Sequence, residues 1–124
     1  MLSEQLQIYR DTFKLCQALL SYNNNISKTV RYGMYADCLS MSCEALDCIY
    51  VANSDVSKRY EALGRYICLI GGVRSRIRLL SENEKWRYLS VRQQHTLMLI
   101  LDKVNRQAIG WRNSAQNARI VNSV

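Results

Sequence analysis

The sequence predicts an all-α protein, folded as an up-down-up-down antiparallel four-helix bundle. Four segments repeat apolar residues at alternating steps of four and three, which is the period of a helix with one buried face. The 124 residues include no proline, so nothing of that kind interrupts long helices. No segment shows the strict alternation of apolar and polar residues that is typical of a half-buried strand. We expect one domain over residues 1–112, followed by a polar C-terminal tail over residues 113–124.

The first helix is expected over residues 3–22. Ser3 can cap its start by accepting a hydrogen bond from an early backbone N–H group. The asparagines at 23–25 tolerate the left-handed geometry that often ends a helix. The expected buried stripe consists of Leu2, Leu6, Tyr9, Phe13, Cys16 and Leu20.

The second helix is expected over residues 27–53. Its stripe consists of Cys38, Met41, Ala45, Cys48 and Ala52, and it is widened by Leu39, Leu46 and Ile49. A wide apolar stripe indicates that the helix packs against two neighbours rather than one. The small residues on the stripe permit a close approach between helices.

The third helix is expected over residues 55–80, with Ser54 or Asp55 as its N-cap. Arg74 interrupts its stripe, which consists of Val56, Tyr60, Leu63, Ile67, Ile70 and Ile77. Gly71 and Gly72 each cost roughly 1 kcal/mol relative to alanine in a helix interior. The pair therefore predicts either a bend or a tight contact with another helix.

The fourth helix is expected after a linker over residues 81–89. Ser90 and Gln93 have the spacing of a capping box, in which a side chain and a backbone N–H satisfy each other reciprocally. The stripe consists of Leu97, Leu101, Val104, Ala108 and Trp111. We expect the helix to end near Arg112 and the polar residues beyond it to fray.

The five cysteines include no pair with CxxC spacing, and we expect four of them on the apolar stripes: Cys16, Cys38, Cys48 and Cys68. We expect buried free thiols in a reducing compartment. The N-terminal residues lack the basic and apolar regions of a signal peptide, and the apolar runs are far shorter than the ~20 residues that a membrane span needs. The sequence therefore predicts a cytoplasmic protein.

Catalytic and metal-binding motifs are not found. His95 is the single histidine and lies beside two glutamines at the start of the fourth helix, so we expect it at the surface. Glu44 and Asp47 share a helix face, but a di-metal bundle needs carboxylates from several helices and Glu-x-x-His pairs. No phosphate-binding glycine loop or nucleophile motif occurs. We predict a non-enzymatic protein without a metal, cofactor or small-molecule substrate.

The basic residues are the main functional signal, because the net charge of +7 is concentrated in the second half of the chain. Two helices of an antiparallel pair could present them as one basic band, and arginine guanidinium groups match the geometry of phosphates. This pattern predicts contact with RNA or DNA, while solvated outer helix faces remain the alternative. The candidate nucleic-acid-binding residues are Lys58, Arg59, Arg65, Arg74, Arg76, Arg78, Lys103, Arg106 and Arg112.

The eight tyrosines are too many to bury in so small a bundle. We therefore consider Tyr32, Tyr35 and Tyr66 as candidates for contact with a partner. Surplus apolar and aromatic faces indicate self-association or a protein partner.

Several stretches carry a resemblance to a known family: residues 26–54, residues 56–60 at the start of the third helix, Arg74, and residues 108–111 near the end of the fourth. Over about residues 6–112 the chain resembles the accessory variability determinant (Avd) proteins of diversity-generating retroelements. A related family with the same fold is encoded by intervening sequences in bacterial 23S ribosomal RNA genes.

The resemblance to the Avd family implies a ring-shaped homopentamer of four-helix bundles, bacterial or phage-encoded, that binds a reverse transcriptase and its template RNA. Such a protein would support adenine-specific mutagenic cDNA synthesis without being the polymerase. Lys58, Arg59, Arg74 and Arg76 would lie where the family uses basic side chains. The alternative is a protein-interaction module of the ribosomal intervening-sequence type, without a reverse-transcriptase partner.

Overall fold

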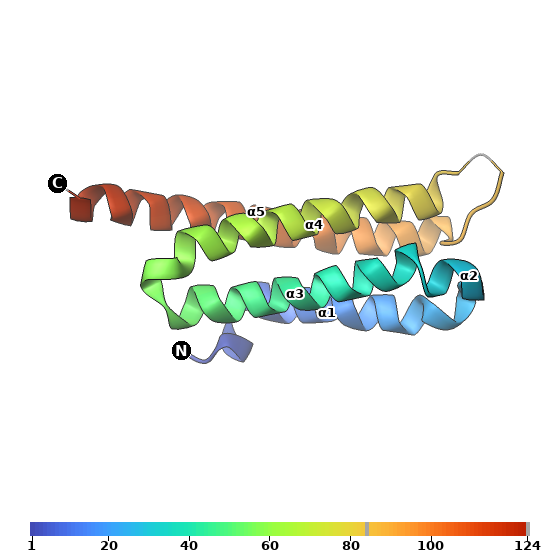
Figure 1. Cartoon of the computed structure of the whole chain (residues 1–124), viewed down its shortest axis with the longest axis horizontal. Coiled ribbons are helices and arrows are strands. Elements are labelled where there is room, and N and C mark those ends of the chain that lie inside the picture. The colour runs from blue at the N-terminus through green and yellow to red at the C-terminus, as the bar shows by residue number, and fades with distance from the viewer. Residues whose placement is uncertain (84, 124) are drawn as a thin grey trace.

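The computed structural model describes residues 1–83 and 85–123, and for residues 121–123 it describes the helical backbone alone. Four long helices occur within these residues, and no strand: α1 (Gln7–Tyr22), α3 (Met34–Ser54), α4 (Arg59–Ser81) and α5 (Val91–Ser123) (Figure 1). The shorter elements are η1 (Ser3–Gln5), η2 (Asn23–Asn25), α2 (Lys28–Arg31) and η3 (Val56–Lys58). The all-helical prediction is confirmed. Glu84 in the predicted linker and Val124 in the predicted tail lie outside the described residues.

The long helices lie side by side around one core. α3 packs against α1 and α4, and α5 packs against the same two helices. In Figure 1 the α3–α4 turn lies at the same end of the molecule as the N-terminus, and the α4–α5 connection and α2 lie at the opposite end. The largest fully buried side chains come from α1, α3, α4, α5 and the α4–α5 connection: Tyr35, Tyr66, Leu15, Leu19, Ile49, Leu63, Ile70, Ile77, Leu89, Leu97, Leu101 and Val73.

The buried face of α1 differs from the predicted stripe. Ile8, Leu15 and Leu19 are buried, whereas Phe13 is 46% exposed and Leu20 is 57% exposed. α1 contains two sets of apolar residues, the predicted stripe and the observed buried residues, which are offset by one position in the sequence. An offset of one residue rotates a helix face by about 100°. The observed face includes Thr12, which is fully buried because its hydroxyl bonds both the Ile8 carbonyl (2.7 Å) and the Tyr66 hydroxyl (2.6 Å). Apolar spacing alone was therefore wrong at Leu2, Phe13 and Leu20, which are exposed. Of the other predicted positions, Cys16 is buried, and Leu6 and Tyr9 are partly buried against the core.

The second predicted helix is interrupted near its start. Gly33 has φ −105° and ψ −110°, which lies outside the helical region, so α2 ends at Arg31 and α3 begins at Met34. The predicted stripe of α3 is confirmed, because Cys38, Ala45, Cys48 and Ala52 are buried and Met41 is partly buried. Tyr35 is not free for a partner, since its side chain is buried and its hydroxyl donates to the Leu19 carbonyl; Tyr32 remains exposed.

The third predicted helix corresponds to α4, which runs through both glycines without interruption. A Cβ on Gly72 would clash with the Met41 side chain of α3, so the predicted tight contact is confirmed there, whereas Gly71 faces open space. Leu63, Ile70 and Ile77 are buried as expected, but Val56 precedes the helix and is 72% exposed. Tyr66 was considered as a partner contact, and the structure instead buries it completely against Thr12.

The fourth predicted helix is α5, and its capping box is present. The Ser90 N–H donates to Gln93 Oε1 (3.0 Å), and the Gln93 N–H donates to Ser90 Oγ (3.1 Å). The predicted stripe is buried at Leu97, Leu101, Val104 and Ala108, and Trp111 is partly buried. The predicted end at residue 112 is wrong, because α5 continues to Ser123 and projects beyond the α3–α4 turn (Figure 1).

The extension of α5 has a physical basis. No glycine or proline follows Gly110, so nothing in the sequence breaks the helix. The turns beyond residue 112 also gain a contact, because the Arg119 guanidinium lies 4.9 Å from the centroid of the Tyr60 ring in α4.

All five cysteines are free thiols. Cys16, Cys38 and Cys48 are buried as predicted, but Cys68 is exposed and its prediction was wrong, because it follows Ile67 on the outer side of the α4 stripe. Across residues 1–83 and 85–123, no helix has the length and apolar character needed to cross a membrane.

Candidate nucleic-acid interface

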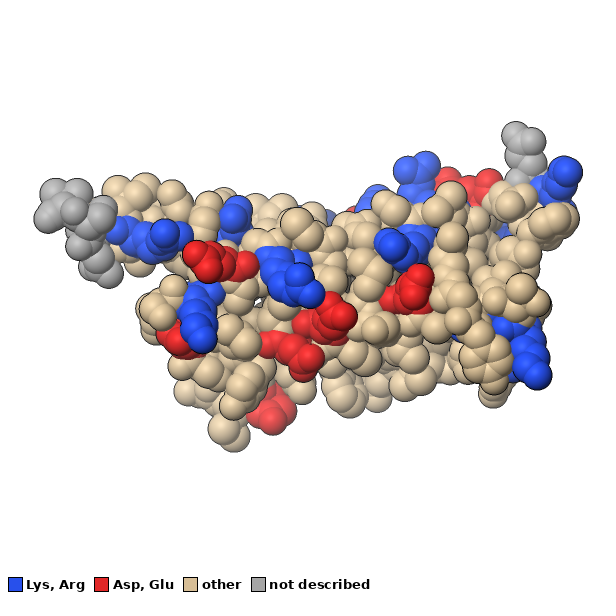
Figure 2. Space-filling model, viewed as in Figure 1, with Lys and Arg blue, Asp and Glu red and all other residues tan. Residues whose placement is uncertain are grey.

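The predicted basic residues do not form one uncompensated band. Figure 2 shows lysine and arginine side chains interspersed with acidic ones over the middle of the viewed face. Four of the nine candidates form ion pairs: Arg65 with Glu44 (3.0 Å), Arg78 with Glu82 (2.8 Å), Lys103 with Asp11 (3.4 Å) and Arg74 with Asp102. A paired guanidinium or ammonium group attracts a phosphate less than a free one does, because the neighbouring carboxylate opposes it.

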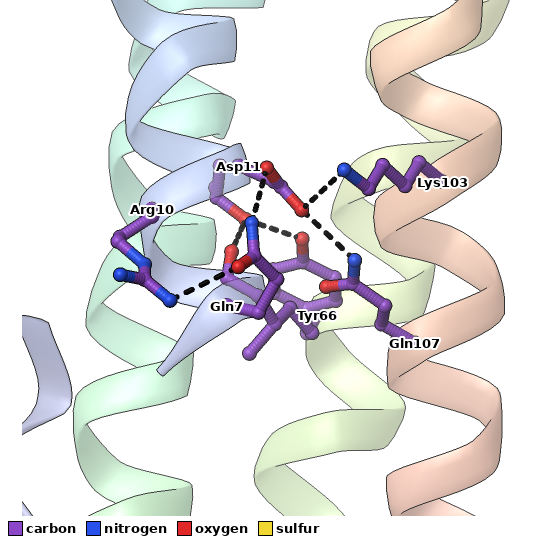
Figure 3. A network of polar contacts seen from close by, with 8 residues as sticks. Gln7, Arg10, Asp11, Tyr66, Lys103 and Gln107 are labelled. Atoms are coloured by element: carbon purple, nitrogen blue, oxygen red, sulfur yellow. Dashed lines mark hydrogen bonds and ion pairs between the residues drawn. The ribbon is translucent and has the colours of Figure 1, made fainter. Parts of the chain in front are cut away.

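Lys103 belongs to a partly buried polar network between α1 and α5 (Figure 3). Asp11 is only 3% exposed, and it accepts hydrogen bonds from Gln7 Nε2 (3.0 Å) and Gln107 Nε2 (2.9 Å). Burial raises the pKa of Asp11, but the hydrogen bonds from Gln107, Gln7 and Lys103 outweigh it and lower the pKa. Lys103 therefore compensates a buried carboxylate and is a structural residue.

Lys58 and Arg65 line a shallow groove between α3 and α4 that also contains the carboxylates of Glu44, Asp47 and Glu61. This groove is acidic on balance and does not favour a polyanion. Arg76 is partly buried, and its guanidinium donates to the Gly72 carbonyl (3.1 Å) within α4. Arg106 is exposed, and no hydrogen bond or ion pair joins it to another described residue.

The two remaining candidates, Arg59 and Arg112, lie together where the first turn of α4 meets α5. Arg59 Nε donates to the Ala52 carbonyl at the end of α3 (2.8 Å), and its guanidinium lies 5.4 Å from the centroid of the Trp111 ring. Arg112 Nε donates to the Tyr60 carbonyl (3.3 Å), and its guanidinium lies 3.9 Å from the Tyr60 ring centroid. Cation–π contacts of this kind hold both arginines against aromatic rings without neutralising their charge.

Arg119 completes this cluster. It lies seven residues after Arg112 on α5, so the two side chains project from nearly the same face. Its guanidinium also lies over the Tyr60 ring, at 4.9 Å from the centroid. None of the described carboxylates forms an ion pair with Arg59, Arg112 or Arg119.

A groove of about 440 Å³ opens between the start of α4 and the projecting half of α5. We call it the arginine–aromatic groove, and its lining residues include no aspartate or glutamate: Val56, Ser57, Arg59, Tyr60, Trp111, Ser114, Ala115, Ala118 and Arg119. Asp55 immediately precedes it, but its carboxylate accepts hydrogen bonds from the Ser57 N–H (3.0 Å) and hydroxyl (2.6 Å). The groove combines guanidinium groups, which bind phosphates, with aromatic rings, on which the bases of a nucleic acid can stack.

Sequence reasoning found Arg59 in the groove lining and Arg112 beside it, but it did not identify Tyr60, Trp111 or Arg119 as binding residues. Tyr60 and Trp111 were assigned to the core stripes, and both are only partly buried. Arg119 was placed in a frayed tail. The signal that could have found it is the helical spacing of Trp111, Ala115 and Arg119, which continues the period of α5 beyond the predicted end.

No protein-family model, curated protein or solved structure matches this chain. Among the residues that the structure describes, no three His, Cys, Asp or Glu side chains gather as a metal site would require.

Proposed function

We propose that this protein is a non-enzymatic accessory subunit of a diversity-generating retroelement, of the Avd type. It binds the reverse transcriptase and the template RNA or DNA, and thereby supports mutagenic reverse transcription. The observation that carries the proposal is the arginine–aromatic groove, whose lining includes Arg59 and Arg119 but no carboxylate, with Arg112 beside it over the Tyr60 ring. The basic residues elsewhere on α4 and α5 are largely paired.

The position of the groove supports this proposal. Two of the stretches that resemble the Avd family, residues 56–60 and residues 108–111, contribute Val56, Ser57, Arg59, Tyr60 and Trp111 to the lining. Guanidinium groups that are not engaged by carboxylates can replace the counterions of a nucleic acid, and their release makes binding depend on salt. Phosphate contacts of this kind give affinity without sequence selection.

The proposal extends to the assembly. We propose an up-down-up-down antiparallel bundle, which the alternation of the helix connections between the two ends of the molecule supports (Figure 1). Several copies, as in the pentamer of the Avd family, would give weak grooves a useful combined affinity. Light scattering would then report about five times the 14.4 kDa of one chain. The proposed location is the cytoplasm of a bacterium.

The test compares two triple variants with the same change in net charge. The groove variant carries Arg59→Gln, Arg112→Gln and Arg119→Gln, and the control variant carries Arg65→Gln, Arg74→Gln and Arg78→Gln. Binding to a labelled single-stranded RNA should weaken at least about tenfold in the groove variant, with a salt slope smaller by about 2, and change less than about threefold in the control. Arg119→Gln alone supplies a milder variant, because Arg119 forms no backbone hydrogen bond with the described residues.

The proposal is wrong if the wild-type protein does not bind RNA at low salt, or if the control variant loses as much affinity as the groove variant. Co-purification with a tagged reverse transcriptase from the same retroelement tests the protein partner separately. Capture of the polymerase by the wild-type protein is the expected result.

A second candidate function is a protein-interaction module of the ribosomal intervening-sequence type, without a reverse-transcriptase partner. The exposed apolar side chains of Phe13 (46% exposed) and Leu20 (57%), which lie seven residues apart and therefore on one face of α1, favour it. Exposed apolar residues that cluster on one face are typical of protein-binding surfaces. Failure of RNA binding together with capture of a protein that depends on Phe13 and Leu20 would favour this alternative.

A further inference from the structure

The arginine–aromatic groove also has a shape and lining that restrict what can enter it. The inference below deepens the proposed function and rests on it. We infer that the groove takes one unpaired nucleotide of a single-stranded RNA or DNA, with its base against the Tyr60 and Trp111 rings and its phosphates on Arg59 and Arg119. The protein therefore binds single strands in preference to duplexes.

The size of the groove supports a single nucleotide. Its volume of about 440 Å³ lies in the range of small-molecule sites, and neither strand of a duplex could enter it while its bases stay stacked and paired. The rings of Tyr60 and Trp111 are partly buried in the lining, so a ligand that only touches the surface with phosphates would leave them unused. An unpaired base can reach them, because it is free to rotate out of the strand.

The arginines over the Tyr60 ring differ in how firmly they are held. Arg112 is partly buried, donates to the Tyr60 carbonyl (3.3 Å) and lies against Gly64, where an added Cβ would be 3.1 Å from a guanidinium nitrogen. Arg119 is exposed, and among the described residues its contact with the ring, at 4.9 Å, is the one that holds it. Arg119 can therefore move aside for a base and then bind the adjoining phosphate, because an exposed cation–π contact is weaker than base stacking on an aromatic ring.

The remaining lining residues predict little base selection. Val56, Ala115 and Ala118 present apolar surface. The Ser114 hydroxyl already donates to the Gly110 carbonyl (3.2 Å), and the Ser57 hydroxyl donates to Asp55 (2.6 Å). Stacking accepts any base because every base has a π-face, so we expect the groove to tolerate different sequences.

The opposite flank of α4 indicates where the strand does not run. The groove between α3 and α4 contains Glu44, Asp47 and Glu61, which oppose a phosphate backbone. The projecting half of α5 carries no acidic residue between Trp111 and Ile120. The strand therefore follows α5 rather than crossing toward α3.

The experiment measures the binding of three labelled probes of the same sequence and at the same salt concentration: a 12-nucleotide single-stranded RNA, the corresponding single-stranded DNA, and the blunt RNA duplex. The wild-type protein should bind both single strands at least about tenfold more tightly than the duplex, as expected when one or two bases stack on aromatic rings. Tyr60→Leu should lose about tenfold in single-strand affinity and change duplex binding less than threefold. Tyr60→Phe is the matched control, because it keeps the ring and should retain the wild-type affinity.

A second readout does not depend on the stability of a Tyr60 variant. In a Trp86→Phe background, Trp111 is the remaining tryptophan, since the sequence contains two. Its fluorescence should be quenched by single-stranded RNA and unchanged by the duplex. Equal affinity for single strands and duplex, with both weakened by Arg119→Gln, would refute the inference while leaving the proposed function intact. Absence of binding to every probe would refute the proposed function itself.

Discussion

The hydroxyl groups of Thr12 and Tyr66 form a 2.6 Å hydrogen bond across the bundle, joining α1 to α4, while each of these helices packs mainly against α3 and α5. Both side chains are fully buried. Thr12 also bonds the Ile8 carbonyl (2.7 Å), so Tyr66 donates to Thr12 when Thr12 donates to Ile8. The pair favours this rotation of α1 about its axis, because the observed face places the Thr12 hydroxyl opposite Tyr66.

Removing one partner at a time should have unequal effects. Thr12→Val leaves the Tyr66 hydroxyl buried without a partner and should lower the free energy of unfolding by about 1–3 kcal/mol, whereas Tyr66→Phe leaves Thr12 bonded to Ile8 and should cost about 1 kcal/mol. Urea denaturation measures both changes. The double variant should cost less than the sum of the single variants, since the residues are in contact. Additive costs would show that the hydroxyls are not coupled.

Gly71 and Gly72 provide a matched pair of neighbouring helix positions with different surroundings. Gly71→Ala adds a methyl group in open space and should raise the free energy of unfolding by about 0.5–1 kcal/mol through helix propensity. Gly72→Ala should raise the free energy of unfolding less than Gly71→Ala does, or lower it. The reason is that Met41 must move and Arg76 lies 3.3 Å from the added Cβ. Thermal or urea denaturation shows which of the two variants is more stable. A larger increase in stability from Gly72→Ala would contradict the close approach of α3 and α4.

The elements that sequence reasoning predicted well are those whose determinants are local. The Ser90–Gln93 capping box joins residues three apart, and the α5 stripe repeats at regular helical spacing from Leu97 to Ala108. The face of α1 was predicted only in part, because its buried polar residues have hydrogen-bond partners far along the chain: Tyr66, 54 residues from Thr12, and Gln107, 96 residues from Asp11. Spacing within one helix carries no information about such partners.

The candidate site was predicted only in part for a related reason. Charge counting identified Arg59 and Arg112 but could not separate them from Arg65, Arg74 and Arg78, whose carboxylate partners lie on the same or neighbouring helices. Arg119 was missed because its role depends on α5 continuing beyond residue 112 to reach Tyr60. Except for the local Arg78–Glu82 pair, these are contacts between helices, which appear only once the bundle is assembled.

Asp11 should make the stability of the protein depend on acid pH. Hydrogen bonds lower its pKa in the folded state, so the unfolded state binds the proton more readily and stability falls as pH decreases below about 4. Above that pH the contribution is fully present. Asp11→Asn should cost about 1–3 kcal/mol at pH 7 and should lose this part of the acid dependence. Urea denaturation of the wild-type protein and the variant between pH 7 and pH 2 measures the free energy of unfolding at each pH.

The matched control for this variant is Asp102→Asn, because Asp102 is the half-exposed partner of Arg74 and its ion pair is screened by solvent. It should change stability by less than about 1 kcal/mol at pH 7. An acid dependence that persists unchanged in Asp11→Asn would show that other carboxylates are responsible.

The five thiols should divide into two classes toward alkylating reagents. Cys43 and Cys68 are exposed, whereas Cys16, Cys38 and Cys48 are buried. Burial raises the pKa of Cys16 and Cys38 to about 12, so their reactive thiolate forms are scarce at neutral pH in addition to being inaccessible. Iodoacetamide at pH 7.5 should therefore modify two thiols in the native protein and five in 6 M guanidinium. Mass spectrometry of tryptic peptides identifies which residues react, and a Cys43→Ser, Cys68→Ser variant should remain unmodified while folded. Rapid native modification of Cys38 would contradict its place in the core, since the reagent could reach it only if α3 left its neighbours.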